Sequence, residues 1–457
     1  MDKDIAGRKA LVVGLGKSGV AACRLLAMHG ARVSATDAKQ VAALAPALAQ
    51  LEGVKLEKLF FGSIADEAFA DRDLIVLSPG VPLATPALAA ALARGVEVIG
   101  EVELAARFID EPILGITGTN GKSTTTALTG HLLETAGLRV FTGGNLGNAL
   151  SNRVLEGGKL DATVAELSSF QLESISRLRC AAACVLNLTP DHLDRYPSLE
   201  AYAAAKARIF AGQRKQDVAV LNLRDARVRA METQPGVVRR GFDSALLPQL
   251  VCDVDGTLPV GRLTGPRRLR IDGWGFDLRA KTLRGAHNAE NALAALLLAL
   301  HLGARPDDLQ RGLDSYPGLP HRLEPVRVVD GVEWVNDSKA TNVDSVEKSL
   351  TAFEHGVILV MGGRGKGSPY APLRPLFAGR VKALLTLGED GPRIARELGD
   401  LAPLTECGDL LTACQTARTL ARAGDTVLLS PACASYDQFQ NFEERGEKFK
   451  AMVREMA

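Results

Sequence analysis

A glycine-rich turn at residues 118–123 combines the residue types that bind a polyphosphate. Gly118-Thr-Asn-Gly-Lys-Ser123 follows an apolar run, Pro112 to Ile116, and leads into a helical pattern that starts near Lys122. In such a strand–turn–helix unit, backbone N–H groups and the helix N-terminus face the phosphates, the lysine reaches the terminal phosphates, and the hydroxyl binds Mg²⁺. The general pattern has a glycine where this chain has Ile116, so the match is to a shorter variant. The alternative is a plain glycine turn that happens to hold a lysine; we predict a nucleoside triphosphate site.

Polar side chains follow the next predicted strands. Strands predicted at 161–165 and 181–186 end at Glu166 and Asn187, and His192 lies a few residues further on. Because ligands gather at the carboxyl edge of a parallel sheet, these groups are expected near the phosphate loop. Glu166 and His192 are types that bind hard cations. Each alone is more often structural, but beside a phosphate loop the set predicts a metal site.

Two helical segments carry polar side chains whose role their spacing leaves open. Lys206, in a predicted helix at 202–210, is expected on a solvated face. Asn288 and Asn291 are three residues apart and share one face of the first turn of an apolar helix. Asparagines at a helix start usually act as caps, but two amides there can also hydrogen-bond a nucleobase.

The first hundred residues contain a second nucleotide-binding pattern. Gly14-Leu-Gly-Lys-Ser-Gly19 follows an apolar strand and opens a helix, and Asp37 ends the next strand about 20 residues beyond the glycines. Ser78 ends a later strand and is expected in the same region of the sheet. The alternative is a glycine turn needed only to pack the helix against the strand.

The last third of the chain again alternates strands and helices after a proline-rich hinge, Tyr316 to Arg322. The strands predicted there each run into a polar turn, which indicates a mostly parallel sheet with ligands at one edge. Gly362 to Gly367 is basic and glycine-rich, which suits an anion or a mobile surface loop. Between Val237 and Leu283, Asp-Gly turns at 255–256 and 272–273 predict a small insertion of antiparallel hairpins.

Length and charge limit the class of protein. A chain of 457 residues exceeds what one core usually serves, so two or three domains are expected. A net charge of +1 argues against a nucleic-acid surface. The chain has no run of about 18 apolar residues and no signal pattern at its start, so we expect a cytoplasmic protein without a membrane span. Seven cysteines without C-x-x-C spacing fit reduced thiols.

Taken in order, these motifs resemble those of the Mur ligases over nearly the whole chain. The resemblance rests on the phosphate loop, Gly143-Gly-Asn-Leu-Gly147, Glu166-Leu-Ser-Ser-Phe-Gln-Leu-Glu173, Asp191-His-Leu-Asp-Arg-Tyr196, His287-Asn-Ala-Glu-Asn291, His321-Arg322, Asn336-Asp-Ser-Lys-Ala-Thr-Asn342 and Ser430-Pro-Ala-Cys-Ala-Ser-Tyr-Asp-Gln-Phe439. The last two, with the amino-terminal unit, point to the members that add glutamate to UDP-N-acetylmuramoyl-L-alanine. The resemblance implies an α/β protein of three domains: a Rossmann-like 1–100, a P-loop ATPase-like 101–318 with the small β insertion, and a Rossmann-like 319–457.

The resemblance also implies a reaction in peptidoglycan precursor synthesis. ATP phosphorylates the muramoyl-alanine carboxylate, and the amine of glutamate attacks the acyl phosphate. The implied cofactors are ATP and Mg²⁺, as two ions, and the implied partners are small molecules bound by a monomer. D-glutamate is the expected amino acid. Positioning and charge neutralisation dominate such phosphoryl transfer.

Residue by residue, the resemblance implies the following functions. The catalytic residues are Lys122, His192 and Lys206, and the metal ligands are Ser123, Glu166, His192 and Lys206, the last as a carbamate. The ATP site comprises Gly118, Thr119, Asn120, Gly121, Lys122, Ser123, Asn288, Asn291, Arg322 and Asp337, with Asp337 on the ribose side. The UDP-sugar contacts are Gly14, Leu15, Asp37, Ser78 and Asn145, and the glutamate pocket is formed by Thr341, Lys366, Ser435 and Phe442.

This chain departs from the family pattern at two places, and other functions compete. Ala38-Lys39 follows Asp37 where a hydroxyl and a basic residue are expected, and Arg364 stands where an acidic residue often occurs.

The nearest alternatives are a sister Mur ligase, an L-glutamate-adding variant or a folylpolyglutamate synthase. A nicotinamide-dependent dehydrogenase would leave the phosphate loop without a role. A non-catalytic ATP-dependent switch would not need polar clusters at the carboxyl edges of three predicted sheets.

Overall fold

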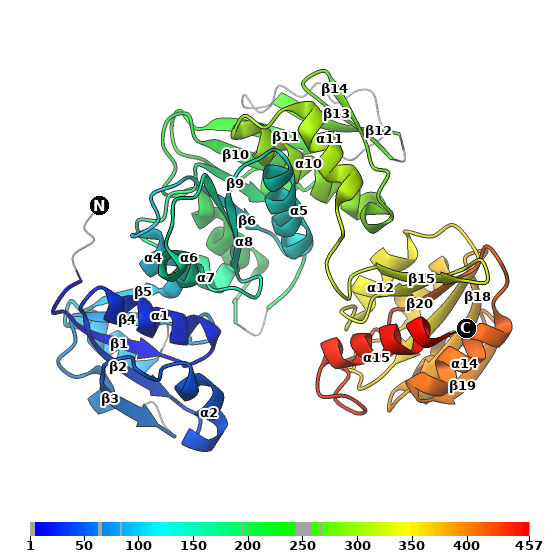
Figure 1. The fold of residues 1–457 in the computed structure, drawn as a ribbon, viewed down its shortest axis with the longest axis horizontal. Helices are drawn as coiled ribbons and strands as arrows, with labels where there is room; N and C mark the ends of the chain where they lie inside the picture. Colours follow the sequence, from blue (N-terminus) through cyan, green and yellow to red (C-terminus); the bar gives the residue numbers. More distant parts are fainter. Residues whose placement is uncertain are drawn as a thin grey trace. The chain divides into compact units, whose positions relative to one another are not determined.

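The computed structural model describes residues 5–62, 66–82, 85–192, 195–243, 258–265 and 267–456; for residues 258–265 it describes the backbone alone. The described residues form three β-sheets accompanied by helices (Figure 1). Contacts within the chain divide it into two compact units. The first comprises Met1–Gly265, Leu269–Phe276 and Glu290–Gly312, and the second comprises Pro266–Arg268, Asp277–Ala289 and Leu313–Ala457. No helix in these described ranges is long and apolar enough to cross a membrane.

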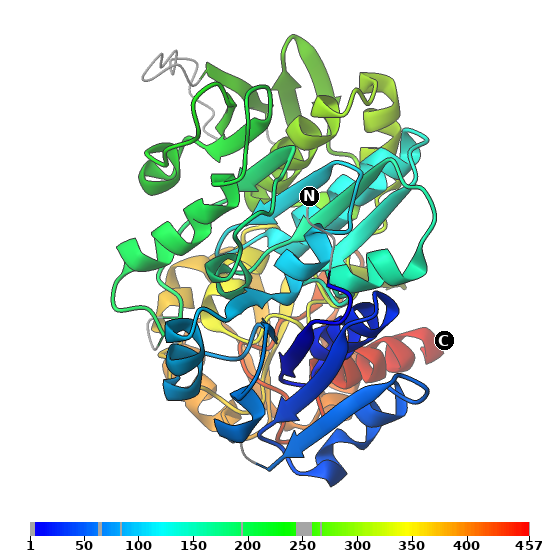
Figure 2. The ribbon, with the colours of Figure 1, turned by 90° about the vertical axis from the view of Figure 1, so that its left-hand side faces the viewer.

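The amino-terminal sheet is parallel throughout, in the strand order β3-β2-β1-β4-β5 (blue in Figure 2). Alternate residues of β1 belong to two hydrophobic clusters, Ala10 and Val12 to one and Leu11 and Val13 to the other, because successive side chains point to opposite faces. The strand order reverses between β1 and β4, so ligands are expected at the carboxyl ends of these two strands. The strands are β1 (Lys9–Val13), β2 (Arg32–Asp37), β3 (Leu56–Phe61), β4 (Leu74–Leu77) and β5 (Glu97–Gly100), and the helices are α1 (Lys17–Met28), α2 (Val41–Ala49), α3 (Pro86–Ala93) and α4 (Glu101–Ala106).

The central sheet has the order β14-β13-β12-β11-β10-β9-β6-β8-β7, with β6 paired in parallel to both β8 and β9. The predicted phosphate loop follows β6, and α5 begins at Lys122 as predicted. The first strands are β6 (Ile113–Thr117), β7 (Val140–Gly144), β8 (Ala162–Glu166), β9 (Ala182–Val185) and β10 (Val218–Asn222). The helices are α5 (Lys122–Thr135), α6 (Leu150–Glu156), α7 (Ser169–Glu173), α8 (Leu199–Ala207), α9 (Ala226–Arg229), α10 (Ala286–His301) and α11 (Pro306–Ser315).

The strands predicted as a small insertion extend this sheet. β11 (Val238–Asp243) runs parallel to β10, and β12 (Leu258–Gly265) runs parallel to β11, so these pairs are not the expected antiparallel hairpins. β13 (Arg268–Ile271) and β14 (Trp274–Asp277) do form a hairpin, because only Asp272 and Gly273 connect them, both with positive φ. The other predicted turn, Asp255-Gly256, lies outside the described residues.

Two buried carboxylates of α4 join the amino-terminal and central sheets. Glu101 Oε1 accepts a hydrogen bond from the Ser151 amide in the first turn of α6, at 2.5 Å. Glu103, which is 0% exposed, accepts hydrogen bonds from the amides of three consecutive residues, Ser176, Arg177 and Leu178, at 2.9 to 3.0 Å. These hydrogen bonds fix two segments that flank the central sheet, the start of α6 and residues 176–178, to α4.

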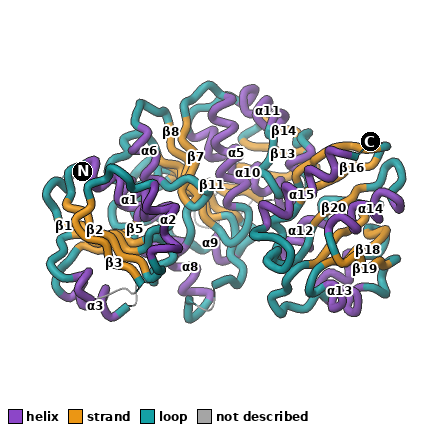
Figure 3. The backbone as a smooth tube through the Cα atoms, turned by 60° about the horizontal axis from the view of Figure 1, so that its bottom comes forward, coloured by secondary structure: helices purple, strands orange, loops and turns teal. Residues whose placement is uncertain are grey.

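The carboxy-terminal sheet has the order β15-β16-β20-β17-β18-β19, with β15 antiparallel to β16 and the other pairs parallel. Alternate residues of β17 belong to two different clusters, so both faces are covered, and Figure 3 shows helices on both sides of these strands. The strands are β15 (Glu324–Val329), β16 (Val332–Asn336), β17 (Val357–Gly362), β18 (Val381–Leu387), β19 (Leu404–Gly408) and β20 (Thr426–Leu429). The helices are α12 (Val343–Leu350), α13 (Gly391–Leu398), α14 (Leu410–Leu420) and α15 (Phe442–Glu455).

Candidate active site

The phosphate loop has the backbone geometry that an anion site requires. Gly121, the N-cap of α5, has φ 85° and no side chain that could cap the helix, so the positive end of α5 faces the loop. A Cβ at Gly121 would lie 2.3 Å from Asn291 Oδ1, so only glycine fits. Asn187, which follows β9, holds the loop in place. The Thr119 amide donates to its carbonyl oxygen at 2.9 Å, and the Asn120 amide donates to its Oδ1 at 2.8 Å.

The Lys122 side chain folds back over this loop. Its Nζ donates to the carbonyl oxygens of Gly118 at 3.0 Å and Thr119 at 2.9 Å. The ammonium therefore lies at the loop, where a phosphate would meet a full positive charge together with the helix N-terminus.

Lys206 lies beside the same loop, and the expectation that it is solvated is wrong. Its side chain is 1% exposed, and its Nζ donates to the Gly118 carbonyl at 2.8 Å and lies 4.6 Å from the centre of the Tyr202 ring. Burial, assisted by the charge of Lys122, lowers the pKa of Lys206 from 10.5 to about 7. Near neutral pH a large share of this lysine is the neutral amine, the form that acts as a nucleophile.

Glu166 fits a metal ion. It is 2% exposed, and its Oε1 accepts a hydrogen bond from Asn145 Nδ2 at 2.9 Å. Its Oε2 is buried and accepts no hydrogen bond from the residues that the structure describes, a costly arrangement that a cation would relieve. His192 is half exposed, has φ 54°, and packs against the Phe170 ring at 4.8 Å.

Protein side chains alone do not complete a metal site. No group of three His, Cys, Asp or Glu side chains in the described ranges is close enough to hold a metal. A hard cation takes about six oxygen ligands and accepts hydroxyls and phosphates. Glu166 would therefore need groups such as the Ser123 hydroxyl and nucleotide phosphates to complete the coordination.

The two asparagines of α10 are buried and hydrogen-bonded. Asn291, 5% exposed, accepts from Thr125 Oγ1 at 3.2 Å in α5, which links α10 to the phosphate-loop helix. Asn288, also 5% exposed, donates to the Arg284 carbonyl at 2.9 Å. Their predicted contact with a nucleobase stays a prediction.

In the second compact unit, Asp337 is tied to its own domain. Its carboxylate accepts from the Leu323 amide at 3.1 Å, Ser349 Oγ at 2.6 Å and Ser430 Oγ at 2.8 Å. Burial raises the pKa of Asp337 to about 6. Arg322, one residue before Leu323, is exposed. Each oxygen of the Asp337 carboxylate thus already accepts a hydrogen bond within the domain. The predicted contact of Asp337 with the ribose stays a prediction.

Arg445, which the sequence did not single out, links three loops at one edge of the carboxy-terminal sheet. It is 0% exposed, and its guanidinium donates to Ser338 Oγ and the Ser338 carbonyl at 2.9 Å, the Cys433 carbonyl at 3.2 Å and the Gly362 carbonyl at 3.5 Å. Burial lowers its pKa to about 10. An arginine inside an otherwise ordinary amphipathic helix gives no signal of such a role in sequence.

The predicted glutamate-pocket residues lie on or next to these loops. Ser435 is 2% exposed and Lys366 is exposed. The Phe442 ring lies 3.7 Å from Lys339 Nζ, and Thr341 is partly buried. Arg364, which departs from the family pattern, forms an ion pair with Glu389 through two hydrogen bonds, at 3.0 and 2.8 Å. The carboxylate of Glu389 thus balances the charge of Arg364 within the same domain.

The amino-terminal turn opens onto a cavity of about 490 Å³. Asp37 forms part of its floor and accepts from the amides of Leu15 at 2.7 Å and Lys39 at 2.9 Å. Ser78 Oγ donates to the Gly14 carbonyl at 2.7 Å. The Leu15 side chain is buried and contributes to the core, whereas the cavity is lined by Gly14, Gly16, Lys17, Ser18, Asp37, Ala38, Lys39, Ser78, Pro79, Gly80, Val81 and Pro82. Lys17 and Ser18 were missed, although their place after the glycine turn could have indicated them.

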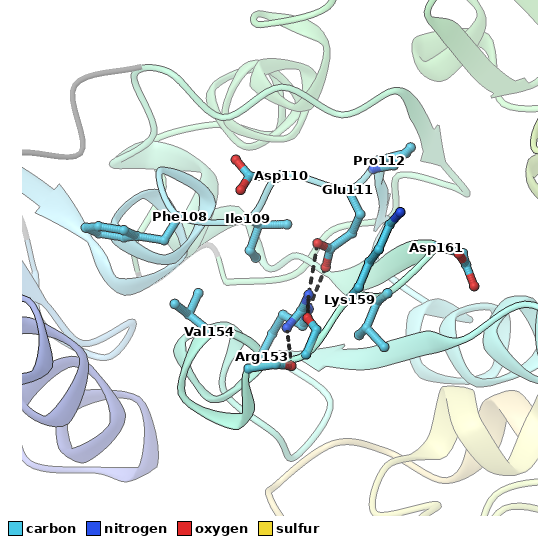
Figure 4. A pocket seen from close by; sticks show the side chains of 12 residues that line it. Phe108, Ile109, Asp110, Glu111, Pro112, Arg153, Val154, Lys159 and Asp161 are labelled. Atoms are coloured by element: carbon cyan, nitrogen blue, oxygen red, sulfur yellow. Dashed lines mark hydrogen bonds and ion pairs between the residues drawn. The ribbon is translucent and has the colours of Figure 1, made fainter.

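A larger cavity, of about 710 Å³, lies at the amino ends of β6 and β8 (Figure 4). Its buried charges satisfy each other: Arg153 forms two hydrogen bonds with Glu111, at 2.6 and 3.0 Å, and donates to the carbonyls of Gly157 and Gly158. This edge of the sheet is opposite the one that carries the phosphate loop, so the cavity is not part of the candidate active site.

Models of three protein families match the chain. Residues 8–100 match the Mur ligase MurD-like N-terminal domain, residues 116–299 the Mur ligase middle domain, and residues 321–433 the Mur ligase glutamate ligase domain. The chain belongs to the Mur ligase family and is an ATP-dependent ligase with three α/β domains.

Individual relatives are similar to this chain over nearly its whole length. The UDP-N-acetylmuramoylalanine–D-glutamate ligase of Anaeromyxobacter dehalogenans is 55% identical and the match covers 99% of each chain. The enzyme of the same name from Myxococcus xanthus is 51% identical over 98% of each chain. The solved structure of MurC, the UDP-N-acetylmuramate–alanine ligase of Thermotoga maritima, shares the fold with a TM-score of 0.58 at 20% identity, over 98% of this chain and 99% of that one.

Proposed function

We propose that this protein joins D-glutamate to UDP-N-acetylmuramoyl-L-alanine at the expense of ATP, in peptidoglycan precursor synthesis. The observation that carries the proposal is full-length similarity to two enzymes whose names state this reaction, at 55% and 51% identity. The phosphate loop and the buried lysine beside it support the ATP-dependent part.

The first chemical step is transfer of the γ-phosphoryl group to the muramoyl-alanine carboxylate. A carboxylate oxygen attacks the phosphorus, and ADP leaves. The loop from Gly118 to Ser123 binds the phosphates, and the Lys122 ammonium stabilises the charge that develops on them. Ser123, Glu166, His192 and a Lys206 carbamate would hold Mg²⁺, which would neutralise further charge on the phosphoryl group.

The Lys206 carbamate would form from the neutral amine and CO₂. The nitrogen bonds to the carbon of CO₂ and releases one proton, which converts a buried amine into an anion beside Glu166. The lowered pKa favours this step, because it supplies neutral amine near pH 7. The resulting set of ligands would hold two metal ions rather than one.

The second step is attack of the glutamate amine on the acyl phosphate. The amine nitrogen bonds to the acyl carbon, a tetrahedral intermediate forms, and inorganic phosphate leaves as the amide is completed. The loops joined by Arg445 would hold glutamate through Thr341, Lys366, Ser435 and Phe442. Asn288, Asn291, Arg322 and Asp337 would bind the nucleoside part of ATP.

The domain bounds that we propose are 1–100 for the UDP-substrate, 101–318 for ATP and 319–457 for the amino acid. The protein would act as a cytoplasmic monomer. Gly14, the Leu15 backbone, Asp37 and Ser78 would surround the UDP moiety, and Asn145 would meet the sugar. Asn145 also donates to Glu166, so it would couple substrate binding to the metal site.

Phosphate release from ATP tests the proposal. We expect release only when UDP-N-acetylmuramoyl-L-alanine and D-glutamate are both present, in a panel that includes L-glutamate, L-alanine and diamino acids. Release with a diamino acid would indicate a sister ligase, and a preference for L-glutamate would indicate the L-glutamate-adding variant. Release that ignores the muramoyl nucleotide would contradict the proposal altogether.

A further inference from the structure

Helix α6 begins without a capping side chain of its own. Its N-cap is Ala149, whose methyl group cannot accept a hydrogen bond from the amides of the first turn. The acceptor comes from α4 instead, because Glu101 Oε1 accepts a hydrogen bond from the Ser151 amide at 2.5 Å. Glu101 is 2% exposed and lies far from α6 in the chain, so a buried carboxyl of one segment caps the helix of another.

The loop that leads into α6 holds the predicted metal ligand Glu166. Asn145 in this loop forms two hydrogen bonds with Glu166: its amide donates to the Glu166 carbonyl at 2.8 Å, and its Nδ2 donates to Glu166 Oε1 at 2.9 Å. The bond to Oε1 fixes the carboxylate, and Oε2, which has no hydrogen-bond donor among the described residues, is the oxygen left for a cation. Hydrogen-bond partners of this kind orient the side chains that bind a metal.

The same loop is also tied to the first turn of α6. The Gly144 amide donates to the Asn148 carbonyl at 2.7 Å, and Asn152 Nδ2 in α6 donates to Asn148 Oδ1 at 2.7 Å. A Cβ at Gly144 would lie 2.4 Å from the Glu166 carbonyl oxygen, so the loop packs directly on the end of β8. A shift of the first turn of α6 would therefore move Asn145 relative to Glu166.

We propose that Glu101 is a positioning residue for the metal site, because by capping α6 it fixes the loop from which Asn145 holds Glu166. Glu101 itself would touch neither the metal nor a substrate. The inference rests on the proposed function, because that function supplies the nucleotide with which the metal binds.

Binding of Mn²⁺ to the full-length protein with ADP, followed by electron paramagnetic resonance, tests the proposal without turnover. Mn²⁺ accepts the same oxygen ligands as Mg²⁺. Glu101→Met fills the same space without an acceptor for Ser151, and we expect it to weaken Mn²⁺ binding about fivefold, which corresponds to about 1 kcal/mol, the usual worth of a helix cap. Asn145→Ala should weaken binding about tenfold or more, as the loss of a direct partner of a metal ligand does. The double variant should bind no more weakly than Asn145→Ala, because Glu101 acts through Asn145.

Two further variants of α4 separate positioning from general stability. Glu101→Gln keeps an acceptor oxygen for the Ser151 amide and removes a charge that burial already disfavours, since burial raises the pKa of Glu101. It should therefore bind Mn²⁺ as wild type does. Glu103→Gln is the matched control, because Glu103 is also buried in α4 but accepts from residues 176–178. It should lower the thermal midpoint and leave Mn²⁺ binding unchanged, when all variants are compared well below their midpoints.

Three results would overturn the proposal: Mn²⁺ affinity unchanged in Glu101→Met, additive losses in the double variant, or a loss in Glu103→Gln or Glu101→Gln equal to that in Glu101→Met. Product formation distinguishes this inference from the proposed function. If the wild-type protein binds Mn²⁺ with ADP but forms no product from UDP-N-acetylmuramoyl-L-alanine and D-glutamate, the proposed function fails, and the Mn²⁺ affinities alone decide the role of Glu101. If product forms and Glu101→Met binds Mn²⁺ as wild type does, only the role of Glu101 fails.

Discussion

Removal of CO₂ should inactivate the enzyme reversibly, because the proposed metal site depends on a carbamate at Lys206. The magnitude follows from the pKa. At pH 7 a lysine of pKa about 7 is about half neutral, whereas one of pKa 10.5 is neutral in about one molecule in 3,000. Burial thus raises the reactive fraction roughly a thousandfold or more at this pH. Carbamate formation requires the neutral amine, so activation by CO₂ should weaken as the pH falls through about 7.

The assay is phosphate release in degassed buffer, followed by addition of bicarbonate. We expect activity to fall on degassing and to return with bicarbonate, and ¹³C-bicarbonate to give a carbamate carbonyl signal that Lys206→Ala lacks. Lys206→Ala should lose at least a thousandfold in kcat and recover partly with formate or acetate, while Lys215→Ala, at an exposed lysine, should behave as wild type. Full activity of Lys206→Ala, or no response to CO₂ with no carbamate signal, would exclude a functional carbamate at Lys206.

Lys206→Met separates inactivity from unfolding. The wild-type amine has a depressed pKa in the folded state, so burying its charged form costs stability below pH 7, and this cost disappears as the pH rises toward 10.5. Methionine has no such cost. The variant should therefore be at least as stable as unmodified wild type at pH 6, in chemical denaturation, and remain inactive.

Three further substitutions test the site. Lys122→Ala should lower kcat at least a thousandfold without changing the thermal midpoint by more than a few degrees, and a variant with more than a tenth of wild-type activity would remove Lys122 from the phosphate site. Gly121→Ala should destabilise the protein by about 2 kcal/mol and weaken ATP binding, because its Cβ would collide with Asn291 and its φ is positive; an unchanged urea midpoint would contradict this. Arg445→Met should raise the KM for D-glutamate at least tenfold and the KM for ATP by less than twofold; equal effects on both would mean that Arg445 serves stability alone.

The parts of the site that depend on local backbone chemistry were predictable. The turns at Gly14 and Gly118 follow short apolar strands, so glycine positions and helix starts could be read along the chain. The side chains that depend on packing between distant segments could not be placed from their local pattern. The helical context of Lys206 predicted a solvated lysine, and only the family resemblance indicated its role, because its burial arises from contact with the loop at Gly118. Arg445 acts through carbonyls that come from three separate loops.

The sheet at residues 237–283 illustrates the same limit. The Asp272-Gly273 turn was predictable because its residues favour positive φ. The parallel pairing of β11 with β10 was not, since parallel partners are set by tertiary context and not by the connecting turn.

If the muramoyl carboxylate becomes an acyl phosphate before glutamate attacks it, its two oxygens separate into different products. UDP-N-acetylmuramoyl-L-alanine labelled with ¹⁸O in both carboxyl oxygens tests this directly, by mass spectrometry of the products formed with ATP and D-glutamate. We expect one ¹⁸O in the released phosphate and one in the new amide for each turnover. Released phosphate that carries no label would exclude the acyl phosphate.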